Sequence, residues 1–280
     1  MKIAETVVET RQFCRELRSP KGLLALVPTM GALHEGHLSL VRRARAECGA
    51  VAASIFVNPL QFGPNEDFAK YPRTFADDCA QLEAEGVDLL FAPSAAEMYP
   101  EGAVTKISVD GIGDRLDGAS RPGHFTGVAT VVAKLFHVVE PDRAYFGQKD
   151  AAQLAVLRQM VRDLNFGVEV VACPIVRDAD GLALSSRNKY LSPSERMHAL
   201  ALHRALLAME AMMARGERSS RMLVEEGTEV LRSEAGVRVD YVAAVDAQTL
   251  LPVERVEAGT LVALAAWVGP TRLIDNFIAT

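Results

Sequence analysis

The chain has 280 residues, with a hydrophobic fraction of 49% and a charged fraction of 24%, values typical of a globular protein with a sizeable core. Its formal net charge of −6 argues against a dedicated nucleic-acid surface, because phosphate backbones are bound by an excess of Lys and Arg. No uninterrupted apolar run reaches the roughly 20 residues that span a bilayer, and the first residues carry no signal-peptide pattern. The four cysteines form no CxxC pair, so we expect reduced thiols and a cytoplasmic protein without a membrane partner.

The first two thirds of the chain alternate between helical and strand patterns. A helical spacing over 5–18 precedes the first apolar run, and each later apolar run is separated from the next by a helical segment. This alternation predicts a parallel sheet with helices on both faces, that is, a Rossmann-like doubly wound α/β domain. We expect strands over 23–27, 51–57, 87–93, 143–146 and 168–173, and further helices over 38–48, 73–85, 128–139 and 151–164.

The pattern changes after about residue 175. Ser192 and Pro193 are typical of a helix start with proline at the first helical position. We therefore predict a catalytic nucleotide-binding domain over 1–175 and a smaller C-terminal α+β domain over 176–280. The expected elements of the second domain are helices over 193–214 and 219–234, and strands over 239–245, 260–268 and near residue 274.

The stretch 28–37 joins the first long strand to the next helix and contains two glycines and two histidines. Open parallel sheets place ligands at the carboxyl ends of strands, and a helix N-terminus presents free N–H groups to an anion. From such a helix end, His34 and His37 could both donate to phosphate oxygens. Two ordinary structural histidines and a zinc site are the alternatives, although the spacing is one residue short of HExxH and no third ligand is obvious.

Two later turns also carry residue types that bind phosphate. Lys149 follows Gly147 in a strand-to-helix turn, where its ammonium could meet a phosphate. Ser185, Ser186 and Arg187 could wrap an oligophosphate, or they could form an ordinary polar loop. The glycine signatures GxGxxG and GxxxxGK[ST] are absent, which argues against a nicotinamide site and against a P-loop.

Five sequence blocks follow one another along the chain. They are PTMGALHEGH over 28–37, FVNPLQFGPNED over 56–67, RPGHF over 121–125, YFGQKD over 145–150 and DGLALSSRN over 180–188. Together they resemble the pantothenate synthetase (pantoate–β-alanine ligase) family of the HxGH nucleotidyltransferase superfamily. HxGH alone is shared across that superfamily, whereas all five blocks in one chain are specific to the family. Thr126 and His137 depart from the family's usual residues, at positions to which we assign no chemistry.

The resemblance implies ATP-dependent condensation of pantoate with β-alanine to pantothenate, through a pantoyl-adenylate intermediate and with release of AMP and pyrophosphate. It also implies a homodimer, and ATP as co-substrate with Mg²⁺. It assigns no residues as ligands of the metal. Because a reactive acyl adenylate must be shielded from water, we expect the glycine-rich loops and the second domain to act as lid elements.

The resemblance also assigns residues. The expected catalytic residues are His37, His34, Lys149, Ser185, Ser186 and Arg187, with His37 as the proton donor. The expected ATP-binding residues are Met30, Gly31, Ala32, Leu33, His34, Glu35, Gly36, His37, Gly147, Gln148, Lys149, Asp150, Val176, Leu184, Ser185, Ser186 and Arg187. The expected substrate-binding residues are Gln61, Gln153, Asn58 and Arg121. Asp77 and Asp78 are adjacent on a predicted helix and are weak candidates for contact with Mg²⁺.

Three other functions stay open at this point: another HxGH-type nucleotidyltransferase, a non-catalytic ATP-binding module, and a zinc hydrolase that uses His34 and His37. The acidic composition argues against a tRNA-charging enzyme. The complete set of phosphate-facing residues argues against a module without catalysis.

Overall fold

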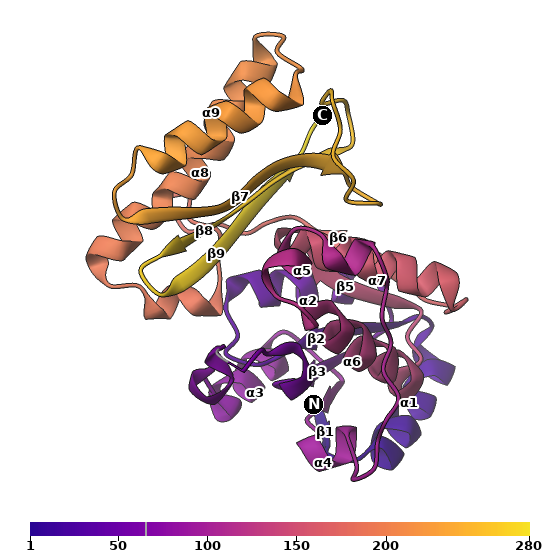
Figure 1. The fold of residues 1–280 in the computed structure, drawn as a ribbon. Coiled ribbons are helices and arrows are strands. Elements are labelled where there is room, and N and C mark those ends of the chain that lie inside the picture. The colour runs from indigo at the N-terminus through magenta and orange to yellow at the C-terminus, as the bar shows by residue number, and fades with distance from the viewer. Residues whose placement is uncertain (65) are drawn as a thin grey trace.

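The computed structural model describes residues 1–64 and 66–280; Asn65, which belongs to the second sequence block, lies outside the described residues. Two sheets organise the chain (Figure 1). The first is parallel, with the strand order β1-β4-β3-β2-β5-β6, and the second is antiparallel, with the order β7-β8-β9. The predicted fold class, a doubly wound parallel α/β sheet followed by a smaller α+β unit, is confirmed.

The elements alternate through the parallel sheet as the sequence indicates. Its strands are β1 (Lys2–Ala4), β2 (Leu24–Thr29), β3 (Ala50–Ile55), β4 (Leu89–Phe91), β5 (Arg143–Gly147) and β6 (Glu169–Cys173). Its α-helices are α1 (Val7–Lys21), α2 (Glu35–Glu47), α3 (Phe75–Ala84), α4 (Ala95–Met98), α5 (Asp117–Ser120), α6 (His124–Val139) and α7 (Ala151–Asp163). Short 3-10 turns are η1 (Pro59–Gln61), η2 (Asp67–Lys70), η3 (Ile112–Asp114), η4 (Gln148–Asp150) and η5 (Ser186–Tyr190).

Several element boundaries differ from the expectation by one to four residues, and β1, α4 and α5 are additional elements. Strand β1 has only three residues, too short to show a period in sequence, and it pairs in parallel with β4 at the sheet edge. Helix α6 begins four residues earlier than expected, after Gly123 in a left-handed conformation. Helix α2 begins at Glu35 and not at residue 38, because the imidazole of His34 caps it. The first turn of α2 therefore belongs to the histidine stretch.

The strand order creates a crevice at β2. From β2 the chain passes to β3 on one side, whereas β5 pairs with β2 on the other side. This reversal is a topological switch point, where open α/β sheets bind ligands beyond the carboxyl ends of their strands. The segments that follow β2 and β5 are residues 28–37 and 147–150, so the fold brings two of the five sequence blocks to one place.

Alternating residues of β2 pack into two different cores. Leu24 and Leu26 pack with α6 and α7 on one face, and Ala25 and Val27 pack with α2 on the other. All four side chains are fully buried, as expected for a central parallel strand. The core on both faces fixes β2, and hence the segment that follows it.

The C-terminal unit contains two helices and the antiparallel sheet. Its elements are α8 (Pro193–Ala214), α9 (Ser220–Arg232), β7 (Val237–Asp246), β8 (Thr260–Val268) and β9 (Thr271–Ile278). In the central strand β8, Val262 and Leu264 pack with α8, whereas Leu261 and Ala263 join the core that surrounds α6 and α7. The sheet therefore lies between its own helices and the first unit, as Figure 1 shows.

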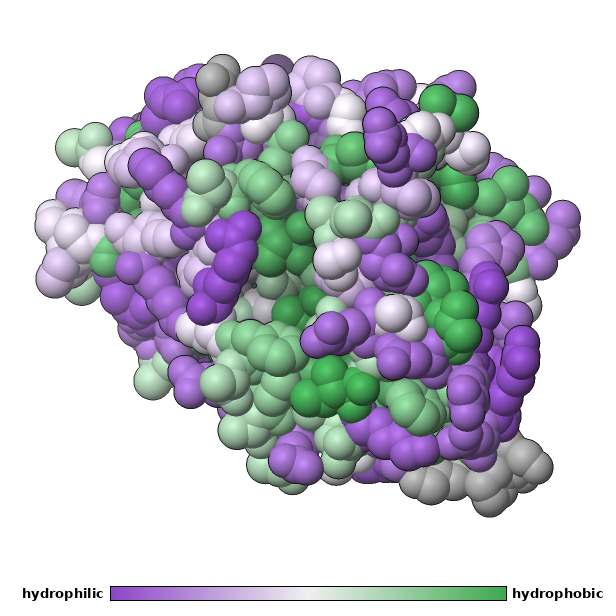
Figure 2. All heavy atoms as spheres, turned by 90° about the horizontal axis from the view of Figure 1, so that it is seen from below, coloured by the Kyte–Doolittle hydropathy of each residue, from purple (hydrophilic) through white to green (hydrophobic). Residues whose placement is uncertain are grey.

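The face seen from below, away from the C-terminal sheet, carries hydrophobic residues in separate patches among hydrophilic ones (Figure 2). Scattered exposed apolar side chains are normal on folded proteins. No helix in the described ranges combines the length and the apolar character that a membrane crossing requires.

Candidate active site

The turn after β2 is held by a buried carboxylate. Asp78 of α3 is 1% exposed and accepts hydrogen bonds from the backbone N–H groups of Ala32 (2.9 Å) and Leu33 (2.8 Å). Gly31 has a φ of +78°, and a Cβ there would lie 2.9 Å from Oδ2 of Asp78, so the turn needs glycine at this position. Asp78 is thus committed to the backbone of the histidine turn, and this role had no signal in the sequence beyond its place on a helix.

The two histidines occupy the first turn of α2 and orient each other. Nδ1 of His34 accepts from the N–H of Gly36 (3.2 Å), Nδ1 of His37 accepts from the N–H of His34 (3.4 Å), and the ring centroids are 4.1 Å apart. A Cβ at residue 36 would lie 2.9 Å from Nδ1 of His34, so glycine lets the ring fold over the helix start. Because each Nδ1 accepts a hydrogen bond, each neutral ring carries its own proton at Nε2.

Burial keeps both rings neutral. It lowers the pKa of His34 to about 4, with a further contribution from the charge of Lys149. It lowers the pKa of His37 to about 3, with smaller contributions from His34 and Lys149. At neutral pH the pair therefore offers two Nε2–H donors without a positive charge of its own.

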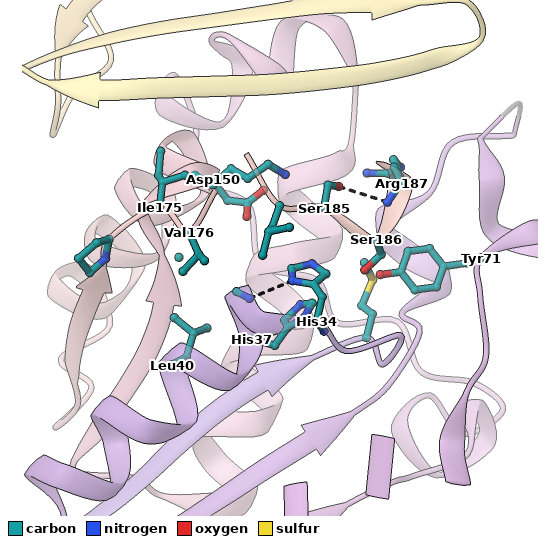
Figure 3. Close-up of a pocket in the computed structure, with 16 residues that line it drawn as sticks. His34, His37, Leu40, Tyr71, Asp150, Ile175, Val176, Ser185, Ser186 and Arg187 are labelled. Atoms are coloured by element: carbon teal, nitrogen blue, oxygen red, sulfur yellow. Dashed lines mark hydrogen bonds between the residues drawn. The ribbon is translucent and has the colours of Figure 1, made fainter. Parts of the chain in front are cut away.

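The histidines form one wall of a cleft at the switch point (Figure 3). The cleft brings together twelve of the seventeen residues that the sequence assigns to ATP: Met30, His34, Gly36, His37, Gly147, Lys149, Asp150, Val176, Leu184, Ser185, Ser186 and Arg187. Four lining residues were missed: Leu40, Tyr71, Pro174 and Ile175. Leu40 could have been found, because it lies three residues after His37 on the same face of α2.

The other five expected ATP residues do not line this cleft within the described residues. The carbonyl oxygen of Ala32 accepts from Oγ of Ser186 (3.1 Å), and Leu33 packs into the core beneath α2. Gly31 contacts Asp78, the carboxylate of Glu35 pairs with Arg42, and the side chain of Gln148 donates to Asn276 (3.2 Å). These five residues contact the core or the residues next to the cleft lining.

The opposite wall carries the cations. Arg187 donates to both oxygens of Asp67, from Nε (3.0 Å) and Nη2 (3.0 Å). Although burial opposes ionisation of that carboxyl, the hydrogen bonds and charge of Arg187 outweigh it and lower the pKa of Asp67. Lys149 lines the cleft, and its ammonium has no carboxylate partner within residues 1–64 and 66–280. An anion in the cleft would therefore meet one unpaired cation and one that is already paired.

A second cavity adjoins the first through Gln61. It is lined by Gln61, Arg121, His124 and Glu66, among others, and Arg121 donates to both oxygens of Glu66 (2.7 and 2.6 Å). Nε2 of Gln61 lies 3.0 Å from Sδ of Met30, which lines the first cavity. Gln61 therefore stands between the two spaces.

The two other expected substrate residues are placed differently. Asn58 is 1% exposed and donates to Oε1 of Gln61 (3.1 Å) and to the carbonyl of Gly127 (3.0 Å). Its own Oδ1 accepts from the hydroxyl of Tyr99 (2.8 Å), so its described polar atoms all serve the protein. Gln153 lies on α7 and belongs to the lining of neither described cavity.

No third metal-ligating side chain joins the histidine pair in the described part of the chain, where no group of three or more His, Cys, Asp or Glu could hold a metal ion. The neutral Nε2–H donors, the capped helix N-terminus and the facing cations suit an oligophosphate instead. A parallel sheet with an HxGH turn at its switch point and a cationic loop opposite defines an HxGH-type nucleotide-binding α/β protein.

Comparison with known proteins narrows this class. A family model for pantoate-beta-alanine ligases matches residues 2–278. A pantothenate synthetase from Acidobacterium capsulatum is 63% identical over 289 residues, covering 99% of this chain and 97% of the relative. One from Thermotoga petrophila is 55% identical over 278 residues, covering 99% of both chains.

Solved structures agree. The pantothenate synthetase of Thermus thermophilus superposes with a TM-score of 0.94 at 52% identity, covering 99% of both chains. A pantoate-beta-alanine ligase of Francisella tularensis, solved with beta-gamma ATP and β-alanine, superposes with a TM-score of 0.80 at 33% identity, covering 99% of this chain and 97% of that one. The chain belongs to the pantoate–β-alanine ligase family, which confirms the family that its five sequence blocks predict.

Proposed function

We propose that this protein joins pantoate to β-alanine at the expense of ATP, forming pantothenate, AMP and pyrophosphate through a pantoyl adenylate. The observation that carries the proposal is the family match over residues 2–278, combined with a cleft in which His34, His37, Lys149 and Arg187 face one space. The Francisella relative, solved with beta-gamma ATP and β-alanine, supports ATP and β-alanine as two of the substrates.

The lining of the cleft indicates how ATP would lie. Leu40, Ile175 and Val176 form an apolar side that suits the adenine base. The triphosphate would extend from there toward the start of α2 on one side and toward Lys149 and the 185–187 loop on the other. We propose that ATP enters as its Mg²⁺ complex, and Asp150 is a carboxylate of the cleft lining that the complex would approach.

The first step needs positioning and charge neutralisation more than covalent help from the protein. An oxygen of the pantoate carboxylate attacks the α-phosphorus, and the bond from that phosphorus to the bridging oxygen breaks with departure of pyrophosphate. The Nε2–H groups of His34 and His37 would donate to phosphate oxygens, with His37 as the more important donor. Lys149, Ser185, Ser186 and Arg187 would stabilise the negative charge of the leaving pyrophosphate.

In the second step the amine of β-alanine attacks the acyl carbon of pantoyl adenylate, AMP departs, and the amine loses a proton. Gln61 would contact pantoate and the incoming β-alanine, since it stands between the two cavities. The packing of Asn58 against Gln61 supports an indirect role for Asn58. Gln153 and Arg121 stay assigned to substrate by family resemblance.

We also propose that the two domains have different roles. Residues 1–175 would form the catalytic nucleotide-binding domain, and residues 176–280, which add Val176 and the 185–187 loop to the cleft, would act as a lid that excludes water from the acyl adenylate. The four free cysteines fit a reducing cytoplasm, and family resemblance alone supports a homodimer.

Exchange of labelled pyrophosphate into ATP tests the proposed function. We expect exchange that depends on pantoate and needs no β-alanine, because the first step is reversible and complete without the amine. Exchange that ignores pantoate would overturn the proposal in favour of another HxGH-type nucleotidyltransferase. ATP binding without exchange would indicate a non-catalytic ATP-binding module.

A further inference from the structure

Two consecutive side chains of β9 contact the two loops that carry the cations of the cleft. Asp275 and Asn276 are polar but only 3% and 2% exposed. Neighbouring residues of a strand point to opposite faces of the sheet, so a buried polar dipeptide can serve two different partners. Figure 3 shows strands of the C-terminal sheet passing above the loops that carry Asp150 and Ser185.

Asn276 is committed to the turn that carries Lys149. Its Nδ2 donates to the carbonyl oxygens of Gln148 (3.1 Å) and Lys149 (2.9 Å), and its Oδ1 accepts from Nε2 of Gln148 (3.2 Å). Both amide hydrogens and the amide oxygen are therefore used on one turn. Because the backbone of Lys149 is fixed in this way, so is the origin from which its ammonium reaches into the cleft.

Asp275 is committed to the loop that leads to Ser185 and Arg187. Its two oxygens accept from Nη1 (2.6 Å) and Nη2 (2.9 Å) of Arg177, whose Nη1 also donates to the carbonyl of Gly181 (3.1 Å). Arg177 thereby links two points of the loop, residues 177 and 181, and connects the start of the loop to β9. A bidentate pair of this kind fixes orientation as well as distance.

We propose that Asp275 and Asn276 are positioning residues for adenylation: from the C-terminal sheet they set the spacing between the two loops that carry Lys149 and Arg187. This inference rests on the proposed function. Neither side chain lines the cleft, so both act through Lys149 and through the 177–187 loop. Pyrophosphate leaves only in the first half-reaction, so the requirement for well-placed cations belongs to that half.

The test measures the two half-reactions of Asn276→Ala separately. One assay follows pyrophosphate formation from ATP and pantoate in a single turnover, and the other follows the reaction of prepared pantoyl adenylate with β-alanine. We expect the first rate to fall about 10- to 100-fold, as misplacement of a catalytic group by an ångström can cost. The second rate should stay within about twofold of the wild-type value.

Two further variants sharpen the result. Asn276→Asp places carboxylate oxygens against the carbonyls of Gln148 and Lys149, so its first half-reaction should be at least as slow as that of the alanine variant. Asn276→Ser keeps one donor and should fall between alanine and the wild type. Gln248→Ala removes another amide that contacts the first unit, through Nη1 of Arg162 (3.3 Å), but lies away from the cleft loops; both of its rates should stay within about twofold of the wild type.

A proportional loss of both half-reactions in Asn276→Ala would overturn the inference, since a smaller folded fraction lowers both rates alike. An unchanged first half-reaction would overturn it as well. If the alanine variant does not fold, the serine and aspartate variants carry the same comparison. Absence of pantoate-dependent pyrophosphate formation in the wild type would overturn the proposed function instead, so the two failures are distinguishable.

Discussion

The two walls of the cleft are built in different ways. The histidine wall, residues 28–37, is held by groups of its own unit: the carboxylate of Asp78, the caps of α2 and the packing of β2 on both faces. The cationic wall, residues 147–150 and 177–187, is held by side chains from elsewhere in the chain, Asp67 and the Asp275–Asn276 pair.

The two walls therefore supply different things to a bound phosphate: one orients its oxygens, and the other neutralises its charge. The histidine wall offers neutral donors whose tautomers are fixed by backbone N–H groups, so it can direct phosphate oxygens at little cost of reorganisation. The cationic wall offers charge, but the forked donors of Arg187 already face Asp67. A phosphate that takes both donors must displace that carboxylate. We therefore expect the histidine wall to be rigid before ATP binds and the side chain of Arg187 in the cationic wall to rearrange.

Removal of His37 should break the histidine wall and give the largest effect on activity. We expect His37→Ala to lose about 100- to 1,000-fold in pantoate-dependent pyrophosphate exchange, the usual effect of deleting one fixed donor to a developing negative charge. His198→Ala is the matched control, because His198 pairs with Glu234 (2.7 Å) and belongs to the lining of neither described cavity. Near-normal exchange in His37→Ala would remove His37 from the mechanism.

A substitution of Asp78 tests whether activity depends on the backbone turn of residues 28–37 as well as on the two histidines. Asp78→Asn brings an NH₂ group toward the N–H groups of Ala32 and Leu33, so at least one buried donor loses its acceptor. We expect unfolding by urea to cost about 2 kcal/mol less than in the wild type and exchange to fall about tenfold. The exposed neighbour in Asp77→Asn should change neither measurement, and equal behaviour of the two variants would contradict the role of Asp78.

The same contrast explains what could be predicted from the sequence. The histidine wall is local: an apolar strand, a glycine turn and a helix start follow one another, and the five blocks name the family. Even there, the pattern predicts a start at residue 38 whereas α2 begins at Glu35, because a histidine N-cap lacks the usual Ser, Thr, Asp or Asn signal. The sequence offers Asp78 only as a weak magnesium candidate and does not indicate that it binds the turn, 46 residues away at Ala32.

The cationic wall depends on contacts without a local pattern. Lys149 and Arg187 were predicted as phosphate ligands, but not the groups that hold them. Asp67 lies 120 residues from Arg187, and Asn276 lies 127 residues from Lys149. The packing of β9 over the first unit brings Asn276 to Lys149, and the contact between η2 and η5 brings Asp67 to Arg187. Residue type and spacing therefore indicate which groups meet ATP, whereas the fold decides what positions them.

Weakening the pair between Arg187 and Asp67 should have a smaller effect on activity than the changes in the histidine wall. Asp67→Asn weakens the pair that ATP must displace, and pairs near the surface contribute about 0.2–1 kcal/mol. We expect the KM for ATP to fall by about two- to fivefold, measured at saturating pantoate. Glu66→Gln, which affects Arg121 in the second cavity, should leave the KM for ATP unchanged. A higher KM for ATP in Asp67→Asn would show that Asp67 orients Arg187 for phosphate.

The neutrality of the histidine wall predicts a modest dependence of stability on pH. An unfolded histidine has a pKa near 6.5, and burial lowers the pKa of His34 to about 4 and of His37 to about 3. Between these values the unfolded chain binds more protons than the folded one, so the free energy of unfolding falls as the pH falls from 6.5 toward 4. Urea titrations at pH 7.5, 6.5 and 5.5 should show His37→Ala losing less stability than the wild type, by about 1 kcal/mol per pH unit at most. Equal losses of stability in the two proteins would mean that His37 has the same pKa in the folded and unfolded states. Burial would then not keep the His37 ring neutral.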